Sequence, residues 1–148
     1  MDEMPFRFDI DERIQSSCCE LGDWPLSRVF LKNNADYPWL ILVPRIEHAQ
    51  AIDDLSSSQR VQLIEEISAL SAIMRKFFKL DKLNVGALGN IVSQLHVHVI
   101  ARSDQDPLWP HGVWQAALSP SDYAEARLED MVIQLQDRMA EPFLSPNS

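Results

Sequence analysis

The amino-acid sequence predicts an α+β fold with an antiparallel sheet of about five strands, one long helix and a C-terminal helix, in a single domain spanning residues 1–148. Three observations support this class. Strand-like segments follow one another through turn sequences without alternating with helices, which favours hairpins over parallel crossovers. One segment has a long helical period that can cover a sheet. Hydrophobic residues make up 46% and charged residues 24% of the chain, which are ordinary values for a folded domain.

The first strand signals lie near the N-terminus. Residues 6–10 alternate apolar and polar side chains as a short strand does. A turn at 22–26 leads into a strand at 28–32, and the Asn-rich segment 33–36 has hairpin-loop chemistry. Residues 39–43 are apolar throughout, which predicts a mostly buried strand.

The long helix is predicted to begin after Ser56. Gln59 stands three residues later, as the second member of a capping box does. Apolar residues then recur at steps of three and four, which places them along one helix face. This stripe consists of Leu63, Ile67, Leu70, Met74 and Phe77. We expect it to pack against the sheet as part of the core.

Two more strands and a second helix are predicted in the C-terminal half. The strands span about residues 84–88 and 95–102 and are joined by a turn at Gly89-Asn90. A loop rich in Pro and Trp follows at 106–114. The pair Ser119-Pro120 has the residue types of an N-cap and a first helical position, which predicts that the final helix begins there.

Charge and composition exclude several classes of partner. The formal net charge is -9, from 22 acidic and 13 basic residues, so the surface repels phosphate backbones and we expect no nucleic-acid partner. Residues 1–5 lack the regions of a signal peptide, and the uncharged segment 83–101 is too polar to span a membrane. Cys18 and Cys19 are adjacent, which favours reduced thiols. We therefore expect a soluble, cytoplasmic protein with no membrane partner.

The candidate functional residues lie on the last predicted strand. Alternate residues of a strand share a face, so Gln94, His96 and His98 are expected to project together and to face solvent. The intervening Leu95 and Val97 then point into the core. A polar row backed by an apolar row presents reactive groups from a rigid platform.

Two simpler interpretations of this row remain open. A histidine pair on an exposed strand face can be ordinary solvated surface. Two histidines on one strand can also chelate a metal. However, only His48 and His111 remain as further nitrogen ligands, and no acidic residue lies between positions 83 and 101. We therefore expect neither a metal nor a cofactor.

The segment Gln94-Leu95-His96-Val97-His98-Val99-Ile100 resembles the signature of the histidine triad (HIT) family, in which three histidines alternate with apolar residues. The resemblance covers about residues 20–115, because Asn33, the strand after it, the long helix and the strand Asn84-Val85-Gly86 fall in the family's order. It is greatest for a bacterial branch that has the same Gln at the first position and a similar loop at 109–114. The resemblance implies the HIT fold.

The resemblance also implies a role for each position of the motif. His96 matches the middle histidine, which attacks the α-phosphorus of a nucleotide and becomes nucleotidylated. His98 matches the last histidine, whose donor stabilises charge on the phosphate oxygens. Gln94 replaces the first histidine and can form supporting hydrogen bonds, but it cannot act as an acid. Ile91 stands where relatives often have a hydroxyl, so Ile91 and Ser93 leave open which residue, if any, protonates the leaving group.

Three asparagines are the implied substrate-binding residues. Asn33 matches a ribose-contacting residue, with Asn34 as the alternative if the loop is offset by one position. Asn90 falls where the family often has a polar side chain near the phosphates, and Asn84, in the matching strand, completes the set.

The function implied is hydrolysis of the α-phosphate linkage of purine nucleotides, with dinucleoside polyphosphates and nucleoside phosphoramidates as the substrate classes. The alternative is a nucleotide-binding sensor or interaction module that has lost turnover. A homodimer is expected, because related proteins pair through a helix and a sheet edge, which protects an edge strand. Trp109 and Trp114 could serve that contact, the site, or loop packing alone.

Overall fold

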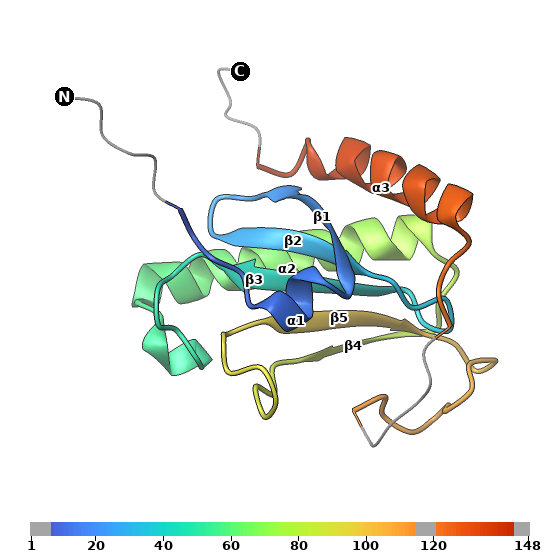
Figure 1. The fold of residues 1–148 in the computed structure, drawn as a ribbon, viewed down its shortest axis with the longest axis horizontal. Coiled ribbons are helices and arrows are strands. Elements are labelled where there is room, and N and C mark those ends of the chain that lie inside the picture. Colours follow the sequence, from blue (N-terminus) through green and yellow to red (C-terminus); the bar gives the residue numbers. More distant parts are fainter. Residues whose placement is uncertain (1–6, 115–120, 144–148) are drawn as a thin grey trace.

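The computed structural model describes residues 7–114 and 121–143 and contains a five-stranded antiparallel sheet with helices (Figure 1). The strands are β1 (Cys18–Asp23), β2 (Ser27–Lys32), β3 (Trp39–Pro44), β4 (Lys82–Gly86) and β5 (Val97–Arg102), in the spatial order β1-β2-β3-β5-β4. The helices are α1 (Glu12–Gln15), α2 (Ser57–Phe77) and α3 (Glu125–Met139), with a 3-10 turn at Ile52–Asp54. The predicted α+β class, the five antiparallel strands, the long helix and the C-terminal helix are confirmed.

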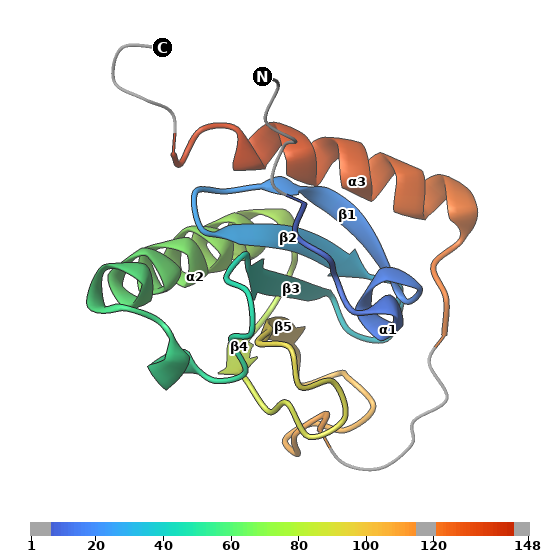
Figure 2. The same cartoon turned by 60° about the vertical axis from the view of Figure 1, so that its left-hand side comes forward.

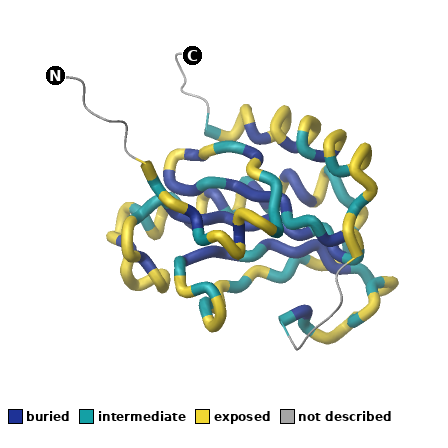
Figure 3. The backbone as a smooth tube through the Cα atoms, viewed as in Figure 1, coloured by how far each residue is buried: buried dark blue, intermediate teal, exposed yellow. Residues whose placement is uncertain are grey.

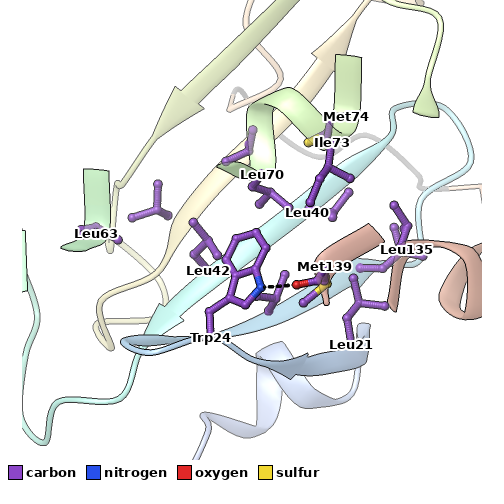
Figure 4. Packing of buried hydrophobic residues seen from close by; sticks show 14 of the residues in the cluster. Leu21, Trp24, Leu40, Leu42, Leu63, Leu70, Ile73, Met74, Leu135 and Met139 are labelled. Carbon is purple, nitrogen blue, oxygen red and sulfur yellow. Dashed lines mark hydrogen bonds between the residues drawn. The ribbon is translucent and has the colours of Figure 1, made fainter. Parts of the chain in front are cut away.

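Helices α2 and α3 pack against the same face of the sheet (Figure 2). Leu40 of β3, Leu70 of α2 and Leu135 of α3 belong to one cluster and are fully buried (Figure 4). Trp24 joins the edge of this layer to α3, because its indole Nε1–H donates to the main-chain oxygen of Met139 at 2.9 Å. The helix-covered face therefore forms the larger part of the core.

The opposite face of the sheet is covered by two segments, residues 8–14, which include most of α1, and the loop 103–114. Ile10 from the first and Val113 from the second pack with Phe30 of β2 in a second buried cluster. The central strands are consequently buried on both sides (Figure 3), and every residue of β3 is buried. This burial on two faces is the reason that β3 is apolar throughout rather than alternating.

The predicted start and apolar stripe of α2 are confirmed. Ser56 Oγ accepts from Gln59 N at 3.2 Å and Gln59 Oε1 accepts from Ser56 N at 2.8 Å, which completes the capping box. Leu63, Leu70 and Met74 are buried in the first cluster, and Ile67 and Phe77 pack against it. In residues 7–114 and 121–143, no helix has both the length and the apolar character that a membrane span requires.

Glu66 lies on the buried face of α2, which hydrophobic periodicity did not predict. Its carboxylate accepts from Leu26 N at 2.7 Å, from Ser27 N at 2.9 Å and from Gln62 Nε2 at 2.9 Å. These bonds tie the long helix to the β1–β2 turn and offset the cost of removing a carboxylate from water.

The prediction of a strand at residues 6–10 is wrong for the part that the structure describes, residues 7–10, which pair with no strand. The sheet instead begins with β1, which was not predicted. A register shift between Glu20 and Gly22, with Gly22 at φ 144°, interrupts the alternation that would have identified this strand.

The two strands that flank the candidate site are also shifted from their predicted bounds. Strand β4 ends at Gly86 rather than at residue 88, and β5 begins at Val97 rather than at Leu95. His96 therefore precedes the regular ladder, at the point where the chain enters the sheet.

The final helix begins at Glu125, after the N-cap Ala124, and not at Ser119-Pro120, which lies outside the described residues. Residues 121–123 are in no helix and are bound by the β2–β3 loop, where Asn33 Oδ1 accepts from Tyr123 N at 2.9 Å. A tertiary contact therefore delays the start of the helix beyond the local capping signal.

Candidate functional site

The candidate residues lie where β5 begins, between β3 and β4. In the sheet His98 pairs with Ile41 of β3 and Gly86 of β4. The ring centroids of His96 and His98 are 4.7 Å apart, so the structure brings these two side chains together as predicted. The prediction that Leu95 and Val97 point into the core is confirmed, since each is 2% exposed.

The prediction that His96 faces solvent is wrong, because the residue is only 8% exposed. Its Nδ1 lies 2.6 Å from the main-chain oxygen of Gln94. A carbonyl oxygen can only accept, so the proton is on Nδ1 and the lone pair is on Nε2 in the neutral ring. Local sequence could not predict the burial, because the segments that cover this face are distant in the chain.

His98 has the opposite tautomer. The indole Nε1–H of Trp39 donates to His98 Nδ1 at 2.9 Å, and an indole can only donate. The proton of the neutral imidazole is therefore on Nε2. Burial, with smaller contributions from the charges of His96 and Lys32, lowers the pKa of His98 to about 3. His98 is a neutral hydrogen-bond donor near neutral pH.

Two tryptophans enclose the His98 ring. The centroids of Trp39 and Trp114 lie 5.5 and 5.1 Å from that of His98, both edge to face. Gly86 makes room for this packing, because a Cβ at that position would lie 3.2 Å from the Trp114 ring. Lys32 Nζ lies 5.0 Å from the Trp39 ring centroid. Sequence reasoning missed Trp39 and Lys32, although their alternation within β2 and β3 puts both on the histidine face.

We expect His98 to make the fold less stable in acid. Its pKa is lowered, so between about pH 6.5 and pH 3 the unfolded chain binds the proton that the folded chain excludes. Stability should therefore fall as pH drops below about 6.5, by at most about 1.4 kcal/mol per pH unit from this group. The free energy of unfolding, measured in urea at several pH values, should fall less steeply with decreasing pH in His98→Gln than in wild type. The exposed His111→Gln should keep the wild-type pH dependence. An equal pH dependence in wild type and His98→Gln would contradict the assignment.

Gln94 contacts a segment that is distant in sequence. Its Oε1 accepts from Asp11 N and its Nε2 donates to Asp9 O, each at 2.9 Å. An open pocket of about 350 Å³ lies beside it, between residues 9–11 and 46–50. A larger groove of about 820 Å³ between α2 and α3 includes none of the candidate residues, so size alone does not identify the site.

The predicted substrate-binding asparagines are not gathered into one cluster of side-chain contacts. Asn33 Oδ1 accepts from Tyr123 N, as described above, and Asn34 Oδ1 accepts from Asp36 N at 3.0 Å. Asn84 Oδ1 accepts from the guanidinium of Arg102 at 2.9 Å. The third candidate, at position 90, is exposed in the loop before His96.

Arg102 anchors the loop that covers the histidines. It is 1% exposed and forms two bonds to Asp106, at 2.7 and 3.0 Å. It also donates to the main-chain oxygen of His111 at 2.7 Å. Trp109 lies over its guanidinium, with the charge 5.9 Å from the ring centroid. This gives Trp109 a packing role, while Trp114 lies at the His98 ring.

In the ranges 7–114 and 121–143 no three His, Cys, Asp or Glu side chains are grouped so that they could hold a metal ion. His48 and His111 are both exposed, and Cys18 and Cys19 are both free thiols.

Comparison with known families assigns the fold. The family model described as the HIT domain matches residues 15–105, which is more than half of the chain. The chain belongs to the HIT family. No functionally curated protein matches it.

Solved HIT structures of considerable identity resemble it over most of its length. A histidine triad protein from Bradyrhizobium japonicum is 40% identical, with a TM-score of 0.84, and the match covers 88% of this chain and 97% of that one. One from Marinobacter aquaeolei VT8 is 40% identical, with a TM-score of 0.85 over 90% and 97% of the two chains. One from Sinorhizobium meliloti 1021 is 34% identical, with a TM-score of 0.80 over 92% and 97%.

A structure of much lower sequence identity resembles this chain in its fold only. It is a hypothetical histidine triad nucleotide-binding protein from Sulfolobus tokodaii, 14% identical, with a TM-score of 0.58 over 84% of this chain and 83% of that one.

Several contacts to the candidate residues come from outside the matched HIT range. Asp9 and Asp11, which bond to Gln94, precede residue 15, while Trp114 and Tyr123 follow residue 105. The site is therefore built from the HIT core together with segments on either side of it.

Proposed function

We propose that this HIT protein hydrolyses the α-phosphate linkage of purine nucleotides through a covalent nucleotidyl-His96 intermediate, with Gln94, His96 and His98 as the three triad positions. The observation that carries the proposal is the pair of opposite tautomers. His96 has its lone pair on Nε2, and its neighbour His98 has its proton on Nε2. A nucleophile and a hydrogen-bond donor are thus held side by side.

The reaction then has two displacements at phosphorus. Nε2 of His96 attacks the α-phosphorus, a P–N bond forms, and the bond to the leaving group breaks with its electron pair departing on that group. His98 Nε2–H donates to a non-bridging oxygen as negative charge builds there. Water next attacks the same phosphorus and loses a proton to solvent, the P–N bond breaks with its electron pair returning to Nε2, and the nucleoside monophosphate and neutral His96 are released.

The residues around the triad positions favour substrates whose leaving group can depart without being protonated. Gln94 is not an acid, and both ends of its amide are bonded to the main chain. His98, with a pKa of about 3, has no acidic proton to give near neutrality. Ile91 has no hydroxyl. Of the two substrate classes, phosphoanhydrides such as dinucleoside polyphosphates should therefore react more readily than phosphoramidates, whose amine leaves best as a protonated group.

The likeness to HIT proteins from Bradyrhizobium and Marinobacter supports placing this chain in a bacterial branch of the family.

One observation favours a second function, a nucleotide-binding sensor or interaction module without turnover. Gln94 has an amide where the family motif has its first histidine, and both ends of this amide bond to main-chain groups. Turnover of a nucleotide separates the two functions.

The test is detection of the intermediate. Rapid quench with a nucleotide that has a good leaving group should add one nucleotidyl mass to the chain, located on His96. Product should form without added inorganic phosphate, with net retention at a chiral α-phosphorus because two displacements each invert it. Binding without any turnover would support the sensor, strict dependence on phosphate would contradict the hydrolase, and inversion would exclude the covalent route.

We also expect a homodimer. Strand β4 is at the edge of the sheet, where Val85 is 48% exposed, and α2 has Val61 and Ile64 each 61% exposed. Pairing would protect the open edge and these apolar side chains. Light scattering should give twice the 16.9 kDa of one chain, and Ile64→Glu should shift the mass toward one chain. A wild-type mass of one chain at micromolar concentration would contradict the expectation.

A further inference from the structure

We propose that Gln94 is a positioning residue whose side chain docks the segment Asp9–Arg13, the N-terminal strap, beside His96 and thereby orients that nucleophile. The catalytic part of this inference rests on the proposed function, whereas the docking does not. The whole strap precedes the range 15–105 that the HIT family model matches. It is an addition to the part of the fold that the family defines.

The Gln94 side chain pairs with the strap as a neighbouring strand would. An extended chain presents the C=O of one residue and the N–H of the residue two positions later on the same edge. The amide of Gln94 meets these two groups with its own donor and acceptor, at Asp9 O and Asp11 N. A neutral histidine ring also has one donor and one acceptor, but its N–H and its lone pair point away from each other, and an ionised glutamate offers two acceptors.

The strap is anchored on both sides of these bonds. Ile10, between the two bonded residues, is 8% exposed and packs in the second core cluster. Asp11 accepts from Arg13 N at 2.9 Å, which caps α1, and its carboxylate also pairs with the Arg13 guanidinium at 3.0 Å. Arg13 Nη1 in turn donates to the main-chain oxygen of Ile91 at 3.0 Å.

Through these contacts the strap holds the segment that carries the nucleophile. Residues 91–96 lie before the start of β5 and are in no strand, so the sheet does not orient them directly. The main-chain oxygen of Gln94 accepts the Nδ1 proton of His96 at 2.6 Å. Displacing Gln94 would move this oxygen, and with it the group that keeps the lone pair on Nε2.

Electrostatics agrees with this placement. Hydrogen bonds from Arg13 are the main cause that lowers the pKa of the Asp11 carboxyl, and the charge of His96 lowers it further.

The first test is Gln94→Glu, which keeps the size of the side chain. The ionised carboxylate of this variant would turn the donor to Asp9 O into an acceptor, whereas its protonated form restores one donor and one acceptor. At about pH 7.5 we expect roughly 10- to 100-fold lower kcat with KM changed less than about threefold, because the nucleophile and not the substrate is misplaced. The ratio of variant to wild-type kcat should recover at least about threefold at pH 5.5 as the carboxyl takes up its proton. Gln15→Glu, on exposed α1, is the charge control and should show neither effect.

The second test removes the donor on the strap. Asp11 has φ -53°, which proline adopts, so Asp11→Pro removes the N–H while Asp11→Ala removes only the carboxylate. With Gln94 present, the proline variant should have kcat at least about fivefold below the alanine variant. When both variants also carry Gln94→Ala, their kcat values should agree within about twofold, because the side chain that accepts from Asp11 N is already missing.

Two measurements decide the inference without turnover. Hydrogen exchange of the strap should be slow in wild type and at least about tenfold faster in Gln94→Glu near neutral pH. The 15N shifts of the His96 ring should report the Nδ1–H tautomer in wild type and a mixture of tautomers in the variant. Unchanged exchange would overturn the docking. Faster exchange with an unchanged His96 tautomer would overturn the positioning role. If exchange and tautomer both change as expected but the wild-type protein hydrolyses no nucleotide, only the proposed function would be refuted.

Discussion

His96→Ala is expected to reduce nucleotide hydrolysis at least about a thousandfold, because it removes the proposed nucleophile and the lone pair of the neighbouring His98 already accepts from the Trp39 indole. The loss should appear in kcat, with nucleotide binding retained, since the proposed contacts of His98 remain. The matched control is His111→Ala, which removes an exposed histidine and should leave kcat unchanged.

The same variant should also lose some stability. Its site is 8% exposed and carries a hydrogen bond to Gln94 O, so the free energy of unfolding should fall by about 1–2 kcal/mol. A solvent-facing histidine, as the sequence predicts, would cost less than about 1 kcal/mol. Thermal unfolding beside the kinetic assay separates lost chemistry from lost folding. Full activity in His96→Ala would refute the nucleophile assignment.

Arg102→Met is expected to lower the free energy of unfolding by about 3–5 kcal/mol. The substitution leaves the Asp106 carboxylate, 6% exposed, without its cation. Burial by itself raises the pKa of Asp106, yet hydrogen bonds, chiefly from Arg102, keep that pKa below its usual value. Removing the guanidinium therefore strands a buried charge and loosens the loop that carries Trp114.

Urea unfolding of Arg102→Met, Asp106→Asn and the double variant would measure the coupling between the two side chains. The exposed pair Arg127–Asp130 is the control, and Arg127→Met should cost less than about 0.5 kcal/mol because solvent screens that contact. A cost for Arg102→Met as small as for Arg127→Met would contradict the anchoring role.

The elements that were predicted correctly are those whose signal is local. The capping box at Ser56 and Gln59 and the apolar stripe of α2 depend on residues three and four apart, which share a helix face in any helix. The strand that follows Asn33 was predicted correctly because an uninterrupted run of five apolar residues is typical of a strand that is buried on both faces. In contrast, β1 was missed because the shift at Gly22 breaks its alternation, and α3 starts late because Asn33 binds the chain at Tyr123.

The sequence by itself determined the fold class and which three residues form the polar row, because Gln94, His96 and His98 stand at alternate positions leading into a strand, although only His98 lies within β5. Only the tertiary structure decided what each of them can do. The proton of His98 is placed by an indole 59 residues away, and the amide of Gln94 is engaged by main-chain groups 83 and 85 residues away. A tautomer, a lowered pKa and a docked amide depend on atoms within a few ångströms. The residues that supply those atoms share no local period with the motif, so only folding brings them together.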